Sequence, residues 1–129
     1  LFAFLHELKQ DKLVLVTDCT RAGGLGDGEY TLGGQRIFVN GIQCRLADGT
    51  IAGSVLKLNE AVRNLRGHAN LNTAQAVAAA SLHPAFAIGA QDKKGSLEAG
   101  KDADIVLFDL DMNARAVYIA GRLKYKKEG

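Results

Sequence analysis

The sequence predicts an α/β fold that combines the end of a β/α barrel with part of a separate, smaller β-structure. Residues 1–9 carry apolar side chains at helical spacing and lead through a short turn into the apolar run 13–16. Helix, turn and strand in this order make half of a βαβ unit. Further along, a hairpin signal and a second apolar run at 104–109 indicate β-structure of another kind. One closed domain does not account for both patterns.

Asp18 stands at the predicted end of the first strand. Residues 13–17 are expected to form a strand buried on both faces, because uninterrupted apolar runs are typical of parallel sheets. Parallel sheets and barrels carry their chemistry at the carboxyl ends of strands, so Asp18 is a candidate catalytic residue. The alternative is a solvated carboxylate that caps the strand end. The Gly-rich segment 21–28 lacks the spacing of a dinucleotide fingerprint, and we expect it to be a mobile active-site loop.

Hairpins and a second strand are predicted by local signals. Asn40-Gly41 is the strongest of these signals, because a type I′ turn needs positive φ at both central residues. Gly33-Gly34 predicts another turn. The second apolar run is expected to be a buried strand in a different, β-rich layer, followed by a hairpin over 116–125 around Gly121.

Further helices are expected in the middle of the chain. Residues 56–65 place apolar side chains on one helical face. Asn72 followed by Gln75 predicts a capping box at the start of an Ala-rich helix that continues through Leu82. Pro84 is expected in the first turn of another short helix, where its missing N–H costs nothing.

The composition excludes several classes of protein. A formal net charge of +2 supports neither nucleic-acid binding nor attachment to an anionic membrane. No apolar run reaches the roughly 18 residues of a membrane span. Two cysteines do not make a disulfide scaffold, so we expect reduced thiols in a cytoplasmic protein. The chain opens within a helical pattern and without Met, so we expect it to belong to a longer polypeptide.

Two stretches near the end of the chain identify a superfamily. Residues 94–109 and 117–122 resemble the C-terminal return of amidohydrolase-superfamily enzymes. In those enzymes the chain leaves a (β/α)8 TIM barrel and completes a small β-sandwich. The resemblance implies that residues 1–90 form the C-terminal end of the catalytic barrel with an inserted β-hairpin. It also implies that residues 91–129 are the returning segment of the β-sandwich.

A further set of motifs is more specific and resembles N-acetylglucosamine-6-phosphate deacetylases. It consists of residues 15–18, 28–34, 48–54 and 61–65, in that order and at those spacings. The resemblance implies that Asp18 is the catalytic aspartate and that Ile51, Ala52 and Gly53 contact the bound sugar, largely through the backbone. Small residues suit such a segment because the main chain must come close to a ligand. The alternative is that residues 48–54 merely join a hairpin to a helix.

The sequence departs from the family at two positions. Cys19 stands where the family usually has Ala, and we interpret it as a small apolar replacement. Ala120-Gly121 stands where the family tends to have Asn-Gly. Because Ala at positive φ is strained, the turn type at this position stays open although a hairpin is expected.

The resemblance also implies a divalent metal, zinc or iron, whose ligands lie upstream of Leu1. His6, His68 and His83 form no His-x-His pair and match none of the family's ligands, so we interpret them as structural or solvated. Asp18 would take a proton from a metal-activated water and pass it to the departing amine. The isolated segment is expected to be inactive.

The implied substrate is a small-molecule amino-sugar phosphate, and the implied assembly is a homodimer. Neither nucleic acid nor a membrane is expected as a partner. Two alternatives remain open. One is another amidohydrolase, of the dihydroorotase-like or deaminase kind, and the other is a non-catalytic structural module.

Overall fold

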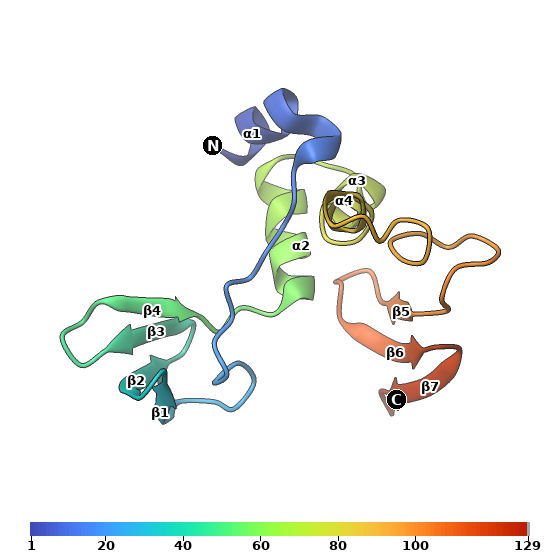
Figure 1. The fold of residues 1–129 in the computed structure, drawn as a ribbon. Coiled ribbons are helices and arrows are strands. Elements are labelled where there is room, and N and C mark those ends of the chain that lie inside the picture. The colour runs from blue at the N-terminus through green and yellow to red at the C-terminus, as the bar shows by residue number, and fades with distance from the viewer. Residues whose placement is uncertain (129) are drawn as a thin grey trace. The chain divides into compact units, whose positions relative to one another are not determined.

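The computed structural model describes residues 1–128, which form two units (Figure 1). One unit consists of residues 16–61, and the other of residues 1–15 together with the chain from Val62 onward. Helices and sheets are both present, which confirms the mixed α/β content, and both sheets are antiparallel. The predicted domain boundary at residue 90 concerns the larger protein and stays a prediction.

The unit of residues 16–61 is built around a four-stranded antiparallel meander. Its strands are β1 (Gly28–Leu32), β2 (Gln35–Asn40), β3 (Gln43–Leu46) and β4 (Ile51–Ser54), and they follow one another in the sheet in chain order (Figure 1). The core of this unit consists of Ala22, Ile37, Val39 and Cys44. Ile37 and Val39 alternate with exposed neighbours along β2, so one face of the meander is buried and the other is not.

The hairpin predicted at Asn40-Gly41 is confirmed, but its turn type is different. Asn40 pairs with Gln43, so the two central residues are Gly41 and Ile42. Only Gly41 has positive φ, at 58°, whereas a type I′ turn requires it at both positions. A type II′ turn has glycine with positive φ at its first central position and negative φ at its second. Ile42, at the second position, can adopt this negative φ.

The other unit contains most of the helices. They are α1 (Phe2–Lys9), the 3₁₀ turn η1 (Gln10–Lys12), α3 (Thr73–Ala78), α4 (Leu82–Ala87) and, from Val62 onward, α2 (Leu58–His68). The capping box of Asn72 and Gln75 is present. The helix that begins there ends at Ala78 rather than at Leu82, and a turn separates it from α4. Buried Leu65, Ala69 and Ala79 form one of this unit's cores.

The strand expected over residues 13–17 is not formed. In the described chain these residues belong to no sheet, and Val16 is 74% exposed rather than buried. Leu13 and Leu15 instead pack against the helical core, and the Leu15 N–H donates to the Ala79 carbonyl at 2.8 Å. A parallel strand is stabilised by neighbouring strands on both sides. None lies beside residues 13–17 in the part of the chain that the structure describes.

The second apolar run does form a strand, as predicted. β5 (Ile105–Phe108) pairs antiparallel with β6 (Ala114–Ile119), which pairs with β7 (Arg122–Lys126), in a sheet separate from the meander (Figure 1). The expected burial is wrong, because Val106, Leu107 and Phe108 are exposed. The apolar side chains of Val106, Leu107 and Phe108 thus remain partly open to solvent.

The hairpin around Gly121 is confirmed, and its turn has the φ pattern of type I′. Ile119 pairs with Arg122, and both central residues have positive φ, 49° at Ala120 and 74° at Gly121. The Asp104 carboxylate accepts a hydrogen bond from the Ala120 N–H at 2.8 Å. This contact holds the turn although Ala at such a φ costs about 1–2 kcal/mol.

Exposed apolar side chains are numerous on α1 as well, where Phe4 and Leu8 are open to solvent. In residues 1–128 no helix is both long enough and apolar enough to cross a membrane.

Candidate active site

Asp18 has a backbone conformation that few non-glycine residues adopt. Its φ is +49°, in the left-handed region, where an L-residue is strained by about 1–2 kcal/mol. Aspartate is among the residue types that tolerate this region best. Strained positions of this kind cluster at active sites, where the surrounding structure holds them. The side chain of Asp18 is exposed, so its carboxylate is accessible.

β4 holds the chain around Asp18. Cys19 forms a parallel bridge with Ser54. The Ser54 N–H donates to the Asp18 carbonyl at 2.9 Å, and the Thr20 N–H donates to the Ser54 carbonyl at 2.8 Å. On its other side Ser54 pairs with Gln43 of β3. The segment around Asp18 therefore extends the meander by a short parallel addition to β4.

Gly53 lies directly against Asp18. A Cβ at position 53 would be 3.1 Å from the Asp18 carbonyl oxygen, 3.7 Å from Asp18 Oδ2 and 2.9 Å from Thr20 Cγ2. Its φ of +107° is likewise unfavourable for a residue with a Cβ. Only glycine permits both this conformation and this close approach. The structure thus brings the predicted catalytic carboxylate and one end of the predicted sugar-contacting segment together.

The rest of that segment leads away from Asp18 along β4. Ala52 is half-buried and packs against the core of the meander, whereas Ile51 is 69% exposed. The strand is preceded by a tight turn in which the Asp48 carboxylate accepts the Thr50 N–H at 2.9 Å, and this bond lowers the pKa of Asp48. Residues 48–50 therefore shape a turn, and residues 51–53 form the strand that reaches Asp18.

The Gly-rich segment 21–28 is held at several points, and its role as a mobile active-site loop stays a prediction. Ala22 is buried in the core of the meander. The Tyr30 hydroxyl lies within hydrogen-bonding distance of the Leu25 and Gly26 carbonyls, at 3.1 and 3.0 Å. The Asp27 carboxylate accepts the Gly41 N–H at 2.7 Å. Tyr30 and Asp27 thus anchor a loop in which Gly24 and Gly26 supply positive φ.

Cys19 is exposed and packs on the loop. Its Sγ would be only 2.3 Å from a Cβ at position 23, so the thiol occupies space that Gly23 leaves free. The Sγ atom also lies 3.4 Å from the Thr20 carbonyl oxygen, to which the thiol donates. These contacts fit the interpretation of Cys19 as a small packing residue.

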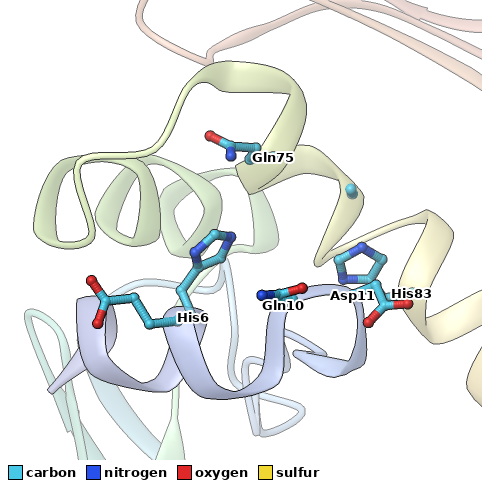
Figure 2. A pocket seen from close by; sticks show the side chains of 7 residues that line it. His6, Gln10, Asp11, Gln75 and His83 are labelled. Carbon is cyan, nitrogen blue, oxygen red and sulfur yellow. The ribbon is translucent and has the colours of Figure 1, made fainter.

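The three histidines lie in the other unit. His83 Nδ1 lies 2.8 Å from the Leu13 carbonyl, to which it donates, and the His68 ring stacks on Phe2 with ring centroids 5.8 Å apart. His6 and His83 line a hollow of about 520 Å³ together with Glu7, Gln10, Asp11, Gln75 and Ala78. Figure 2 shows the His6 side chain extending from α1 into this hollow. His83 and His68 thus have structural contacts, as interpreted from the sequence.

One polar residue next to Asp18 could not be predicted from the sequence. The Ser54 hydroxyl donates to the Thr17 carbonyl, across 37 positions of the chain. Ser54 carries no local signal, because its partners are brought to it by the tertiary structure. The motif of residues 48–54 identified its neighbour Gly53 as a sugar contact. The same motif ends at Ser54 but implied no role for it.

Comparisons with known proteins agree on one family. A protein-family model described as "Amidohydrolase family" matches residues 6–127 of this chain. The chain is 40% identical over 124 residues to the N-acetylglucosamine-6-phosphate deacetylase of Bos taurus, covering 95% of this chain and 30% of that protein. It is 39% identical over 114 residues to a putative N-acetylgalactosamine-6-phosphate deacetylase of Escherichia coli K12, covering 88% of this chain and 68% of that protein.

A solved structure shows the same fold. The crystal structure of N-acetylglucosamine-6-phosphate deacetylase from Pasteurella multocida superposes with a TM-score of 0.89 at 30% identity. The match covers 95% of this chain and 32% of that one. The chain thus spans about a third of the deacetylase of known structure. Since the family model matches nearly all residues of this chain, the chain belongs to the amidohydrolase family.

Proposed function

We propose that this chain is the C-terminal part of an enzyme that hydrolyses the N-acetyl group of N-acetylglucosamine 6-phosphate to glucosamine 6-phosphate and acetate. The observation that carries the proposal is the placement of Asp18 against Gly53. An exposed residue with a carboxylate and a strained backbone lies against a strand whose glycine permits the close approach of the two chain segments. The 40% identity to a deacetylase supports the choice of reaction.

In the proposed reaction Asp18 acts first as a base and then as an acid. Its carboxylate accepts a proton from the water that attacks the acetamide carbonyl. The protonated Asp18 then delivers that proton to the sugar nitrogen as the carbon–nitrogen bond breaks, so the carboxylate is regenerated. A positioned carboxyl group of this kind contributes about 10²–10⁴-fold to the rate. Ile51, Ala52 and Gly53 are proposed to contact the sugar through their backbone.

A divalent metal, zinc or iron, is part of this proposal. When bound, it would polarise the carbonyl and lower the pKa of the attacking water. Within residues 1–128, no group of three or more His, Cys, Asp or Glu could hold a metal ion. The residues of this chain therefore do not fit a complete metal site, and its ligands are proposed to lie upstream in the larger protein.

The larger architecture is proposed on the same basis. Residues 1–90 would form the end of a TIM barrel with an inserted β-hairpin, and residues 91–129 part of a small β-sandwich. The likeness to the Pasteurella multocida enzyme over 95% of this chain supports this arrangement. The exposed apolar residues of β5 support a partner layer over that strand. A homodimer and a cytoplasmic location stay predictions.

N-acetylgalactosamine 6-phosphate is a second candidate substrate. The Escherichia coli relative of that name is 39% identical, nearly as similar as the Bos taurus relative. The two sugars differ only in the configuration of one hydroxyl group. Dihydroorotase-like or deaminase activity and a non-catalytic module have less support, because the similar proteins described above are named as deacetylases.

The test is Asp18→Asn in the complete enzyme, with acetate release measured on both sugar phosphates and bound metal measured in parallel. Asparagine is isosteric but cannot carry the proton, so we expect kcat to fall by about 10²–10⁴-fold with KM and metal content little changed. Asp92→Asn, the same change at an exposed residue of the other unit, should leave kcat unaltered.

Three results would contradict the proposal. Near-wild-type turnover of Asp18→Asn with full metal occupancy would make Asp18 a bystander. Loss of metal together with activity would make it a ligand. Release of ammonia, or no acetate from either sugar phosphate by the wild type, would exclude the deacetylase reaction itself.

A further inference from the structure

We propose that Ser54 is the positioning residue for Asp18. Its hydroxyl and its main-chain N–H bind the carbonyls of the two peptide groups that flank Asp18, and together they set the direction of the carboxylate. The inference rests on the proposed function, because it assigns a role within the same site.

The Ser54 side chain holds the peptide group that precedes Asp18. Its Oγ donates a hydrogen bond to the Thr17 carbonyl, and the same oxygen accepts the Leu56 N–H at 3.1 Å. A serine hydroxyl has one donor and two lone pairs, so both bonds form at once. The Ser54 hydroxyl therefore links the segment that leads into Asp18 to the chain that follows β4.

The main chain of Ser54 holds the peptide group that follows Asp18. Its N–H donates to the Asp18 carbonyl at 2.9 Å, and its own carbonyl accepts the Thr20 N–H at 2.8 Å. Peptide groups are planar, so φ and ψ are the only soft dihedral angles between two of them. Fixing both planes fixes the Cα–Cβ direction of Asp18, from which the carboxylate extends.

This restraint matters because the backbone conformation of Asp18 is unfavourable for a non-glycine residue. At a φ of +49° the residue can relax toward the negative φ region that L-residues prefer. The other nearby side-chain bond, from the Cys19 N–H to Thr17 Oγ1 at 3.3 Å, lies within the segment and does not connect it to β4. Of the three bonds that join Ser54 to this segment, only the hydroxyl bond can be removed by substitution.

The experiment compares Ser54→Ala with Ser54→Thr in the complete enzyme. Alanine frees the Thr17 carbonyl, whereas threonine keeps a hydroxyl that can bind it. Ser81→Ala is the matched control, because Ser81 Oγ makes the same kind of bond to the Gly95 carbonyl, at 2.7 Å, in the other unit. For each variant kcat, KM, metal content and thermal midpoint are measured, and crystal structures of the wild type and Ser54→Ala give φ of Asp18.

We expect Ser54→Ala to lower kcat by about 10-fold or more, with KM changed by less than about threefold, and Ser54→Thr to recover most of the loss. Ser81→Ala should lower the thermal midpoint without lowering kcat. In the crystal structure of Ser54→Ala, Asp18 should leave the left-handed region.

The inference would be overturned by a kcat within about twofold of wild type in Ser54→Ala. It would also be overturned by a loss of kcat that Ser81→Ala matches, or by an unchanged φ of Asp18 in the crystal. These failures are distinct from that of the proposed function. If the wild type releases no acetate, the proposed deacetylase reaction is refuted. The change in φ of Asp18 between the wild-type and Ser54→Ala crystal structures then tests the role of Ser54 separately.

Discussion

Gly53→Ala should reduce both stability and turnover, and the size of the effect follows from the surroundings of Gly53. The new Cβ would lie 2.9 Å from Thr20 Cγ2 and 3.1 Å from the Asp18 carbonyl oxygen, closer than ordinary van der Waals contact. Moving these atoms costs about 1–3 kcal/mol, as in other overpacked sites. The positive φ of position 53 adds about 1–2 kcal/mol of backbone strain.

Gly49→Ala is the matched control for this prediction. Its φ is also positive, +87°, but no atom lies within 4 Å of the Cβ that would be added. Gly49→Ala should therefore lower the free energy of unfolding only by the backbone strain, about 1–2 kcal/mol. In urea unfolding with an unchanged m-value, the free energy of unfolding should be lower for Gly53→Ala than for Gly49→Ala by about 1–3 kcal/mol.

The kinetic effect should separate the two variants further. The clash at position 53 pushes on the main chain of Asp18, the proposed catalytic residue, and a shift of about 1 Å in such a group costs about 10²-fold in rate. We expect a loss of this order in kcat/KM for Gly53→Ala and none for Gly49→Ala, from acetate release by the complete enzyme. Equal stability and equal turnover in the two variants would refute the reasoning that close approach to Asp18 requires glycine.

Two further predictions concern the sheet of β5, β6 and β7. Ala120→Gly should raise the free energy of unfolding by about 0.5–1 kcal/mol, because relief of strain at positive φ exceeds the added entropy of the unfolded chain; a lower urea midpoint would contradict this. Hydrogen bonds from Lys94 and from the Ala120 N–H hold the pKa of Asp104 below its ordinary value of 3.8. Asp104 therefore stabilises the fold fully above pH 3.8, and the contribution is lost as pH falls through the lowered folded-state pKa. Lys94→Met should weaken this acid dependence in unfolding measured as a function of pH, and an identical profile would contradict the assignment.

The elements that could be predicted from the sequence are those whose causes lie within a few residues. The capping box needs only Asn72 and Gln75, three positions apart, and both bonds are present. The hairpin at Asn40-Gly41 formed because glycine supplies positive φ, although only Gly41 uses it and the turn is not the expected type. The hairpin around Gly121 also formed where it was predicted, although its turn is bound in addition by Asp104, 16 positions before Ala120.

Burial and strand pairing could not be predicted in the same way, because they depend on what lies beside a segment. Residues 13–17 have the composition of a buried strand but no neighbouring strands in the described chain, so they run as an extended connection. β5 formed as predicted, yet its apolar side chains are exposed for the same reason. Apolar composition specifies a preference for burial, whereas a partner surface has to supply it.

The sequence by itself predicted Asp18 and the segment 51–53 as members of the candidate site. Asp18 and the segment 51–53 were identified from motifs, without any contact between them being known. Only the tertiary structure decided how they meet. It places Gly53 against Asp18, sets φ of Asp18 at +49°, and brings the Ser54 hydroxyl to the Thr17 carbonyl across 37 positions. A local pattern cannot encode these relations, because each depends on how β4 and the chain around Asp18 pack after folding.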